Sequence, residues 1–253
     1  MSAHWLALAV GAITFGAGMV GLYLQKRLPP EHMTGGSRDM ILAVIGLVTL
    51  LLALVLGTLV GNTYAFYANQ KSELETFASR ALLFDQSLAE YGPEAKPIRD
   101  EFKTALTESY ELFWKGASLD PSLLKVDVPI ARYQPVFEQI KTLEAKTPQQ
   151  IESVAGAKAS LALMEQTRLL MSLQNASPIA WPLVVIVVAW AAFLFCGFGV
   201  LSGTNPTTIV ALAAGAISVA SAIYLILNLS QPYTGHFRLS PAALEQALEA
   251  IDK

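Results

Sequence analysis

Residues 40–61 read MILAVIGLVTLLLALVLGTLVG, an apolar run without a single charged side chain. A hydrocarbon layer about 30 Å thick is crossed by roughly 20 apolar residues of a helix that rises about 1.5 Å per residue. The run is therefore long enough to span a membrane. The charge-free region around it is longer still, because no Asp, Glu, Lys or Arg lies between Asp39 and Lys71.

Three further segments meet the same length requirement, and we expect spans at residues 5–24, 180–201 and 207–229 in addition to 40–61. The first segment has no basic residue before its apolar run and is followed by Lys26 and Arg27, so we interpret it as a membrane helix rather than a signal peptide. Residues 202–206 read SGTNP, which predicts a tight turn between two antiparallel, neighbouring helices.

The composition agrees with an integral membrane protein. The 253 residues are 53% hydrophobic and 15% charged, with a net charge of -3 and a mean hydropathy of +0.46. These values exclude a collagen, a disordered chain and a strongly basic nucleic-acid binder. The single cysteine, Cys196, has no partner for an intrachain disulfide.

Residues 62–177 carry 12 of the 17 basic and 15 of the 20 acidic residues, so this segment faces water. Apolar positions at helical spacing from Leu74 predict that the second span continues as one long helix. Similar spacing predicts helices around 98–113 and 133–143, separated by Gly92-Pro93 and by residues 116–129, so that proline and glycine breaks fall between the helices. Thr147-Pro148-Gln149-Gln150 has the pattern of a capping box, and Ser240-Pro241 opens a short last helix.

These elements define the expected fold. It is an all-α membrane protein with four transmembrane helices and a helical extramembrane domain inserted between spans two and three. The expected domains are a transmembrane hairpin over 1–65, a helical soluble domain over 66–177, a second hairpin over 178–230 and a tail with a short helix over 231–253.

No pattern in the chain predicts catalysis, a cofactor or a metal. His4, His32 and His236 lie far apart and have no second ligand three or four residues away, so ordinary histidines at the membrane interface are the better interpretation. Motifs for nucleophilic catalysis, phosphate binding and zinc hydrolysis do not occur, and no span contains a charged residue of the kind that coupled transporters use. The sequence therefore predicts that the protein is not an enzyme.

Span two is the most informative helix. Gly57-x-x-x-Gly61 permits close backbone approach, which simple helix packing explains. A second interpretation is a pore-lining helix, since Leu50, Leu54 and Thr58 recur at four-residue spacing and rings of apolar side chains gate by dewetting. We define the candidate pore face by the residues that this interpretation assigns to the pore: Leu50, Leu54, Gly57, Thr58, Gly61 and Asn62. Together with apolar faces on the extramembrane helices, Gly57-x-x-x-Gly61 predicts a homo-oligomer.

The count of Lys and Arg near the span ends leaves the side of the helical domain undecided. Lys26, Arg27 and Arg38 flank the loop between spans one and two. Lys71, Arg80, Arg168 and Arg238 lie on the opposite side of the membrane. The two counts nearly balance.

Three short stretches carry a resemblance to a known family. They are Asp39-Met40-Ile41-Leu42 leading into Val55-Leu56-Gly57, then Phe66-Tyr67-Ala68-Asn69-Gln70, and finally Gln231-Pro232-Tyr233-Thr234-Gly235. With the order of spans, they make the chain resemble the bacterial bestrophin-like domain family, named for its similarity to bestrophin chloride channels. The resemblance covers nearly the whole chain.

The resemblance implies a pentameric channel for anions in the bacterial inner membrane, with span two around the axis and the helical domain and both termini in the cytoplasm. It places the neck of the pore at Leu50, Leu54 and Thr58. Two of these positions, Leu54 and Thr58, are aromatic in bestrophins, and no acidic cluster near the tail resembles their calcium site. The expected partners are copies of the chain, the lipid bilayer and small ions. The alternative is a non-conducting scaffold or signalling protein whose helical domain binds a partner.

Overall fold

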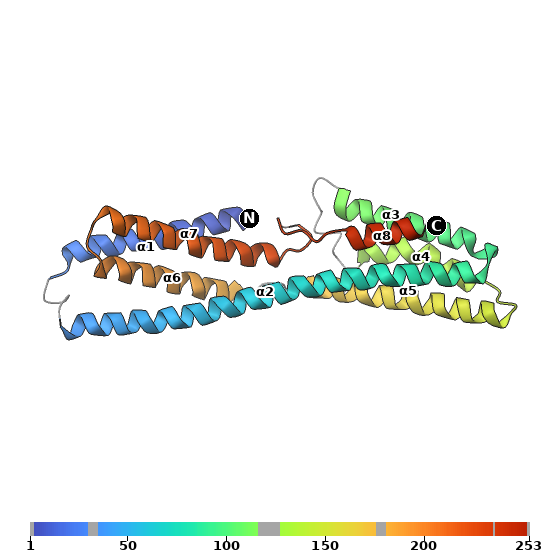
Figure 1. The fold of residues 1–253 in the computed structure, drawn as a ribbon, viewed down its shortest axis with the longest axis horizontal. Helices are drawn as coiled ribbons and strands as arrows, with labels where there is room; N and C mark the ends of the chain where they lie inside the picture. Colours follow the sequence, from blue (N-terminus) through green and yellow to red (C-terminus); the bar gives the residue numbers. More distant parts are fainter. Residues whose placement is uncertain (1–2, 30–34, 116–126, 176–180, 235, 252–253) are drawn as a thin grey trace. The chain divides into compact units, whose positions relative to one another are not determined.

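The computed structural model describes residues 3–29, 35–115, 127–175, 181–234 and 236–251, and within these ranges it is helical without a strand. This confirms the predicted all-α class. The described residues form the α-helices drawn in Figure 1, which are α1 (Ala3–Arg27), α2 (Gly36–Tyr91), α3 (Lys96–Tyr110), α4 (Asp127–Lys141), α5 (Pro148–Asn175), α6 (Trp181–Leu201), α7 (Pro206–Leu229) and α8 (Ala242–Ala250). A 3-10 turn (Pro93–Ala95) precedes α3 and a π turn (Glu111–Lys115) follows it.

The chain divides into two compact units. The first comprises residues 1–66 and 179–230, and the second comprises residues 67–178 and 231–253. We call them the apolar unit and the charged unit. The prediction that the second span continues as one long helix is confirmed, because α2 runs without interruption for 56 residues and contributes to both units.

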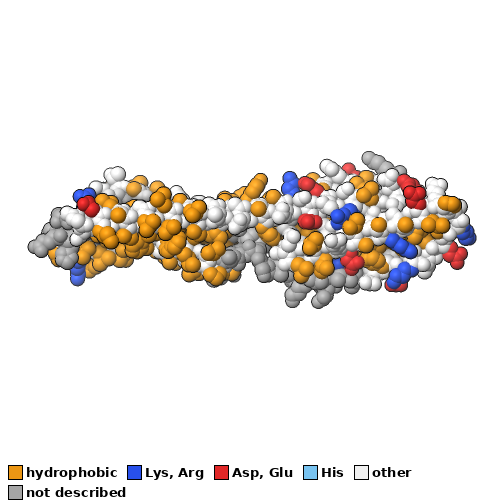
Figure 2. All heavy atoms as spheres, turned by 90° about the horizontal axis from the view of Figure 1, so that it is seen from below, with side chains coloured by type: hydrophobic (Ala, Val, Ile, Leu, Met, Phe, Trp, Pro, Cys, Tyr) orange, Lys and Arg blue, Asp and Glu red, His pale blue; other side chains and the backbone are white. Residues whose placement is uncertain are grey.

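Among the helices that the structure describes, four are long and apolar enough to cross a membrane, namely α1, α2, α6 and α7. These helices begin and end within a few residues of the four predicted spans, except that α2 continues beyond the end of its span. Charged side chains gather on the charged unit in Figure 2, whereas the visible surface of the apolar unit is mainly hydrophobic. A surface of this kind is stable in lipid rather than in water, so the protein is an integral membrane protein.

Helix α1 holds the apolar unit together because it packs along both α6 and α7. Its closest approach to α6 runs through glycines. A Cβ on Gly21 would overlap the carbonyl oxygen of Cys196 and lie 3.0 Å from Cα of Gly199. Small residues allow this approach, and close packing is the main attraction between helices in lipid. The close backbone contact that small residues permit is therefore made between α1 and α6.

The turn between α6 and α7 forms as predicted, but its helices make most of their contacts with α1 rather than with each other. Asn205 caps α7, because its Oδ1 accepts hydrogen bonds from the backbone N–H of Thr208 at 2.8 Å and from the Thr208 hydroxyl at 2.9 Å. Pro206 follows at the first helical position, where its missing N–H costs nothing. A short turn makes the two helices neighbours and does not determine how large a surface they share.

The charged unit encloses a single large hydrophobic core. Its fully buried side chains come from α2, α3, α4, α5 and α8 and include Phe84, Leu88, Phe102, Leu106 and Val136. The rings of Phe84 and Phe102 lie 4.4 Å apart, centroid to centroid. The apolar faces that the sequence predicts for these helices are thus covered largely within one chain. They no longer supply an argument for oligomerisation.

The helix ends of the charged unit follow the sequence closely, with one correction. The amide of Gln150 donates to the Thr147 hydroxyl at 3.2 Å, and Gln150 Oε1 accepts from the Thr147 amide at 3.3 Å, which confirms the capping box. Pro135 lies inside α4, so the prediction that proline breaks fall between helices is wrong there. Pro135 removes one backbone hydrogen bond from α4, and the adjacent Val136 is fully buried in the core. Residues 116–126 of the predicted break lie outside the described residues.

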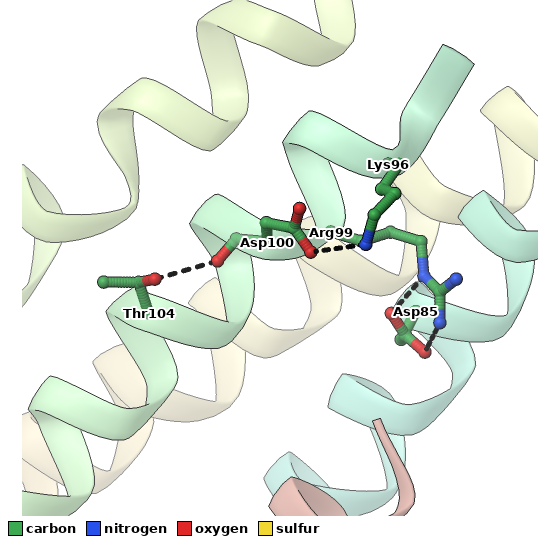
Figure 3. Close-up of polar contacts among 5 residues, drawn as sticks. All are labelled: Asp85, Lys96, Arg99, Asp100 and Thr104. Atoms are coloured by element: carbon green, nitrogen blue, oxygen red, sulfur yellow. Dashed lines mark hydrogen bonds and ion pairs between the residues drawn. The ribbon is translucent and has the colours of Figure 1, made fainter. Parts of the chain in front are cut away.

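One ion pair joins α2 to α3 at the edge of this core, as Figure 3 shows. Arg99 Nε lies 2.6 Å from Asp85 Oδ1, and Arg99 Nη2 lies 2.7 Å from Asp85 Oδ2. The two-point contact with the carboxylate of Asp85 raises the pKa of Arg99 above its usual value. The neighbouring pair of Lys96 and Asp100 is exposed and spans one turn of α3.

Candidate pore-lining face of α2

One narrow stripe of α2 attaches this helix to the apolar unit. Ile45, Leu59 and Thr63 are buried, and Leu52 packs at the edge of the cluster that includes Val10 of α1 and the buried valines and isoleucines of α6 and α7. The hydroxyl of Thr63 donates to the carbonyl oxygen of Leu59 at 2.8 Å, so the stripe buries no unpaired polar group.

The rest of the membrane portion of α2 is uncovered within one chain. Only 6% of its most apolar stretch is buried, compared with 33% in α1 and in α6. All six residues of the candidate pore face are exposed. The exposed fractions of Leu50 and Leu54 are 71% and 65%. Since successive residues turn by about 100° around a helix, these positions lie on the side away from Leu59 and Thr63.

The glycines in the membrane portion of α2 have open space beside them. In the described part of the molecule, no atom outside the helix lies within 4 Å of a Cβ placed on Gly46, Gly57 or Gly61. Among the described residues, Gly57-x-x-x-Gly61 does not pack against another span of its own chain. Its small residues are available to a second chain or to lipid.

The chemistry of the candidate pore face is apolar with a polar end. Leu50 and Leu54 offer only methyl groups. The hydroxyl of Thr58 donates to the carbonyl oxygen of Val55 at 2.8 Å, which leaves its oxygen free to accept from water. Asn62 is exposed one turn further on and carries both amide donors and a carbonyl acceptor. A ring built from this face would have a dry segment followed by a wettable one.

Sequence reasoning did not identify a buried polar network in the charged unit. Gln70 has no exposed surface, its Nε2 donates to Gln174 Oε1 at 2.7 Å, and the phenol of Tyr233 donates to its Oε1 at 2.8 Å. Burial raises the pKa of Tyr233 above its usual range, so this phenol keeps its proton. The signal was present in the sequence, because Gln70 occupies the same helical stripe as Leu74 and Phe77.

Comparison with known proteins adds the family. The model of the Bestrophin-like domain family matches residues 12–244, nearly the whole chain. Searches of curated proteins and of solved structures gave no match. The match includes three of the candidate spans, most of the first span and the residues of the candidate pore face, and it agrees with the resemblance that the three short motifs indicated. The chain belongs to the Bestrophin-like domain family.

Proposed function

We propose that the protein is an oligomeric ion channel that conducts anions, in which α2 of each copy lines the pore. The observation that carries this proposal is the division of α2 into two faces. One face is buried in its own chain, and the other, which includes Leu50 and Leu54, is a long uncovered stripe without a charge. A ring of copies turns such a stripe toward a common axis, as family membership favours.

The constriction in this proposal is formed by Leu50 and Leu54. Methyl groups give an ion no replacement for its hydration shell. The free energy of moving a dehydrated ion into a narrow apolar passage is therefore unfavourable by many kcal/mol. Such a ring therefore excludes ions until it widens. Thr58 lies one turn beyond, on the side of α2 that continues into the charged unit. Gly57, Gly61 and Asn62 complete the pore lining.

The family resemblance supports the remaining parts of the proposal. The ring contains five copies, the membrane is a bacterial inner membrane, and residues 67–178 together with the tail lie in the cytoplasm. Each of the four spans crosses once, so both termini lie on that same side. The turn at residues 202–205 then lies on the outer side.

Cross-linking tests whether the candidate pore face meets its equivalents in other copies. The native cysteine is first removed by Cys196→Ser, and Leu54→Cys is compared with Leu52→Cys in that background. We expect an oxidant to link copies through Leu54→Cys in membranes, because side chains around a narrow axis come close together. The matched control Leu52→Cys faces its own chain and should stay monomeric on a denaturing gel. Equal cross-linking of the two variants would contradict the proposal.

One observation favours the alternative of a non-conducting scaffold. Helix α5 displays exposed leucines, among them Leu163, Leu170 and Leu173 with exposed fractions of 43%, 40% and 57%. Such a row on a water-facing helix is typical of a surface that binds another protein. This account becomes the better one if Leu54→Cys does not cross-link and the purified protein does not conduct.

A further inference from the structure

The charged unit contains a partly open cavity of about 100 Å³, which is lined by residues of α2, α3, the π turn, α4, α5 and the C-terminal segment. One buried water needs roughly 10–15 Å³ by this measure, so the cavity has room for a small organic molecule. Aromatic side chains make up much of the wall: Phe77, Phe113, Trp114, Tyr133 and Tyr233. Walls of this kind favour a ligand with a flat or branched apolar body.

Most polar atoms at this wall are already bonded to the protein. The indole Nε1 of Trp114 donates to the carbonyl oxygen of Leu239 at 3.0 Å, and the phenol of Tyr233 donates to Gln70 Oε1 at 2.8 Å. The hydroxyls of Tyr133 and Ser109 lie 3.3 Å apart, within hydrogen-bond distance. These groups keep the wall dry and rigid, and they leave little hydrogen-bonding capacity for a ligand.

Arg168 is the exception. It is one of the residues that line the cavity, and its Nη1 is buried without a hydrogen-bond partner in the described part of the chain. Nearly all buried polar atoms in folded proteins have a partner, and a buried charged donor without one is especially costly. Arg168 is also the one charged side chain among the described residues that line the cavity. Arg168 Nη1 therefore lacks one hydrogen-bond acceptor, and its positive charge favours an anionic one.

The surroundings limit the charge of that acceptor. Glu165, one turn earlier on α5, attracts Arg168 from the side of a smaller adjoining cavity. Burial lowers the pKa of Arg168, yet a guanidinium stays protonated in proteins. One partly compensated cation among apolar walls can neutralise a single negative charge. A dianion such as a phosphate monoester would remain uncompensated in the cavity.

We propose that this cavity binds a small monocarboxylate with an apolar body, of the class of aromatic or branched aliphatic acids. The carboxylate accepts a charge-assisted hydrogen bond from Nη1 of Arg168. The body of the acid packs against the aromatic wall. The site lies wholly within the charged unit and is independent of the proposed ion pathway.

Titration of the full-length protein in nanodiscs tests the proposal, with phenylacetate as the probe and its neutral isostere phenylacetamide as the matched ligand. We expect phenylacetate to bind wild-type protein at least about tenfold more tightly than phenylacetamide, because only the acid pairs with a buried charge. Arg168→Gln should weaken phenylacetate by about tenfold or more and leave phenylacetamide unchanged. The control Lys158→Gln removes an exposed positive charge from the same helix and should bind phenylacetate as wild type does.

Three results would overturn the proposal. They are the absence of phenylacetate binding to wild type at millimolar concentration, equal affinity for the acid and the amide, and undiminished phenylacetate binding by Arg168→Gln. The comparison of acid and amide needs only the wild-type protein, so it decides the question even if Arg168→Gln fails to fold. Binding of decanoate without binding of phenylacetate would assign the cavity to a lipid-derived acid and would overturn the assignment to a small one.

Discussion

The phenol of Tyr233 donates a 2.8 Å hydrogen bond to Oε1 of Gln70, although 163 positions separate the two residues in the chain. Gln70 is completely buried and 6% of Tyr233 is exposed. Both residues come from short stretches by which the sequence resembles its family. The C-terminal segment is therefore fastened to α2 within the charged unit by a bond that water does not reach.

Loss of this bond should destabilise the charged unit. Tyr233→Phe leaves Gln70 Oε1 buried without its donor, and we expect the free energy of unfolding to fall by about 1–3 kcal/mol. Denaturant titration of the protein in nanodiscs measures the change. Tyr110→Phe is the control, because that phenol donates to Glu245 at the surface, where water can replace the bond. Similar losses in the two variants would show that burial of the Gln70 bond does not matter.

The same phenol predicts a pH dependence. The pKa of Tyr233 is raised by burial, whereas a tyrosine of the unfolded chain ionises near about pH 10. Above that pH the unfolded chain releases the proton and the folded chain retains it, so stability falls as pH rises. We expect the thermal midpoint to decrease above about pH 10. Tyr233→Phe should reduce the slope, and an unchanged slope would contradict the assignment.

The ion pair of Arg99 and Asp85 should contribute far more to stability than its exposed neighbour. Arg99→Met leaves the mostly buried carboxylate of Asp85 unpaired, and we expect a loss of about 3 kcal/mol in the free energy of unfolding. Lys96→Met breaks an ion pair whose two side chains are 73% and 64% exposed, and should cost less than about 1 kcal/mol. Chemical denaturation of the two variants side by side provides the measurement. Equal losses of unfolding free energy in the two variants would mean that water solvates the Asp85 carboxylate when Arg99 is absent.

Truncation of the proposed constriction should increase conduction. Leu54→Ala removes three carbons per copy from the ring, so water and ions enter more easily. Chloride efflux from liposomes containing equal amounts of protein should rise at least severalfold. Leu52→Ala removes the same atoms from the face that packs on the protein's own chain and should change expression rather than flux. The pore assignment fails if the two variants behave alike, or if no form conducts.

Substitutions of Gly21 and Gly57 should have different effects, the first on folding of the chain and the second on assembly of the oligomer. Gly21→Leu puts a side chain into the backbone of α6, so we expect poor expression and loss of the folded chain. Gly57→Leu meets no atom of its own chain within 4 Å in the described residues, so the chain should fold and the change should appear in the oligomer. Native mass measurement in detergent follows both properties. A wild-type monomer of about 27 kDa of protein would remove the channel proposal, since four such helices enclose no axial pore.

Features set by local sequence could be predicted. The four spans, the capping box at Thr147 and the buried positions of α3 follow from length, capping chemistry and helical periodicity, which need only neighbouring residues. The sequence does not predict which helices pack against each other. Gly21 and Gly57 look alike in the sequence, yet only Gly21 meets another helix of its own chain, because that depends on how all four helices pack. The unpaired Nη1 of Arg168 likewise results from tertiary burial, which no local pattern records.

Substitutions on the two faces of α2 should also differ in whether their effect is recessive or dominant. A change at Leu59 weakens the folding of the chain that carries it, so wild-type copies made in the same cell assemble without hindrance and the defect is recessive. A change at Leu54 leaves the chain folded and able to enter mixed assemblies. In a ring of several subunits drawn from an equal mixture, only a small minority then contain wild-type copies alone. Substitutions on the candidate pore face are therefore expected to be dominant.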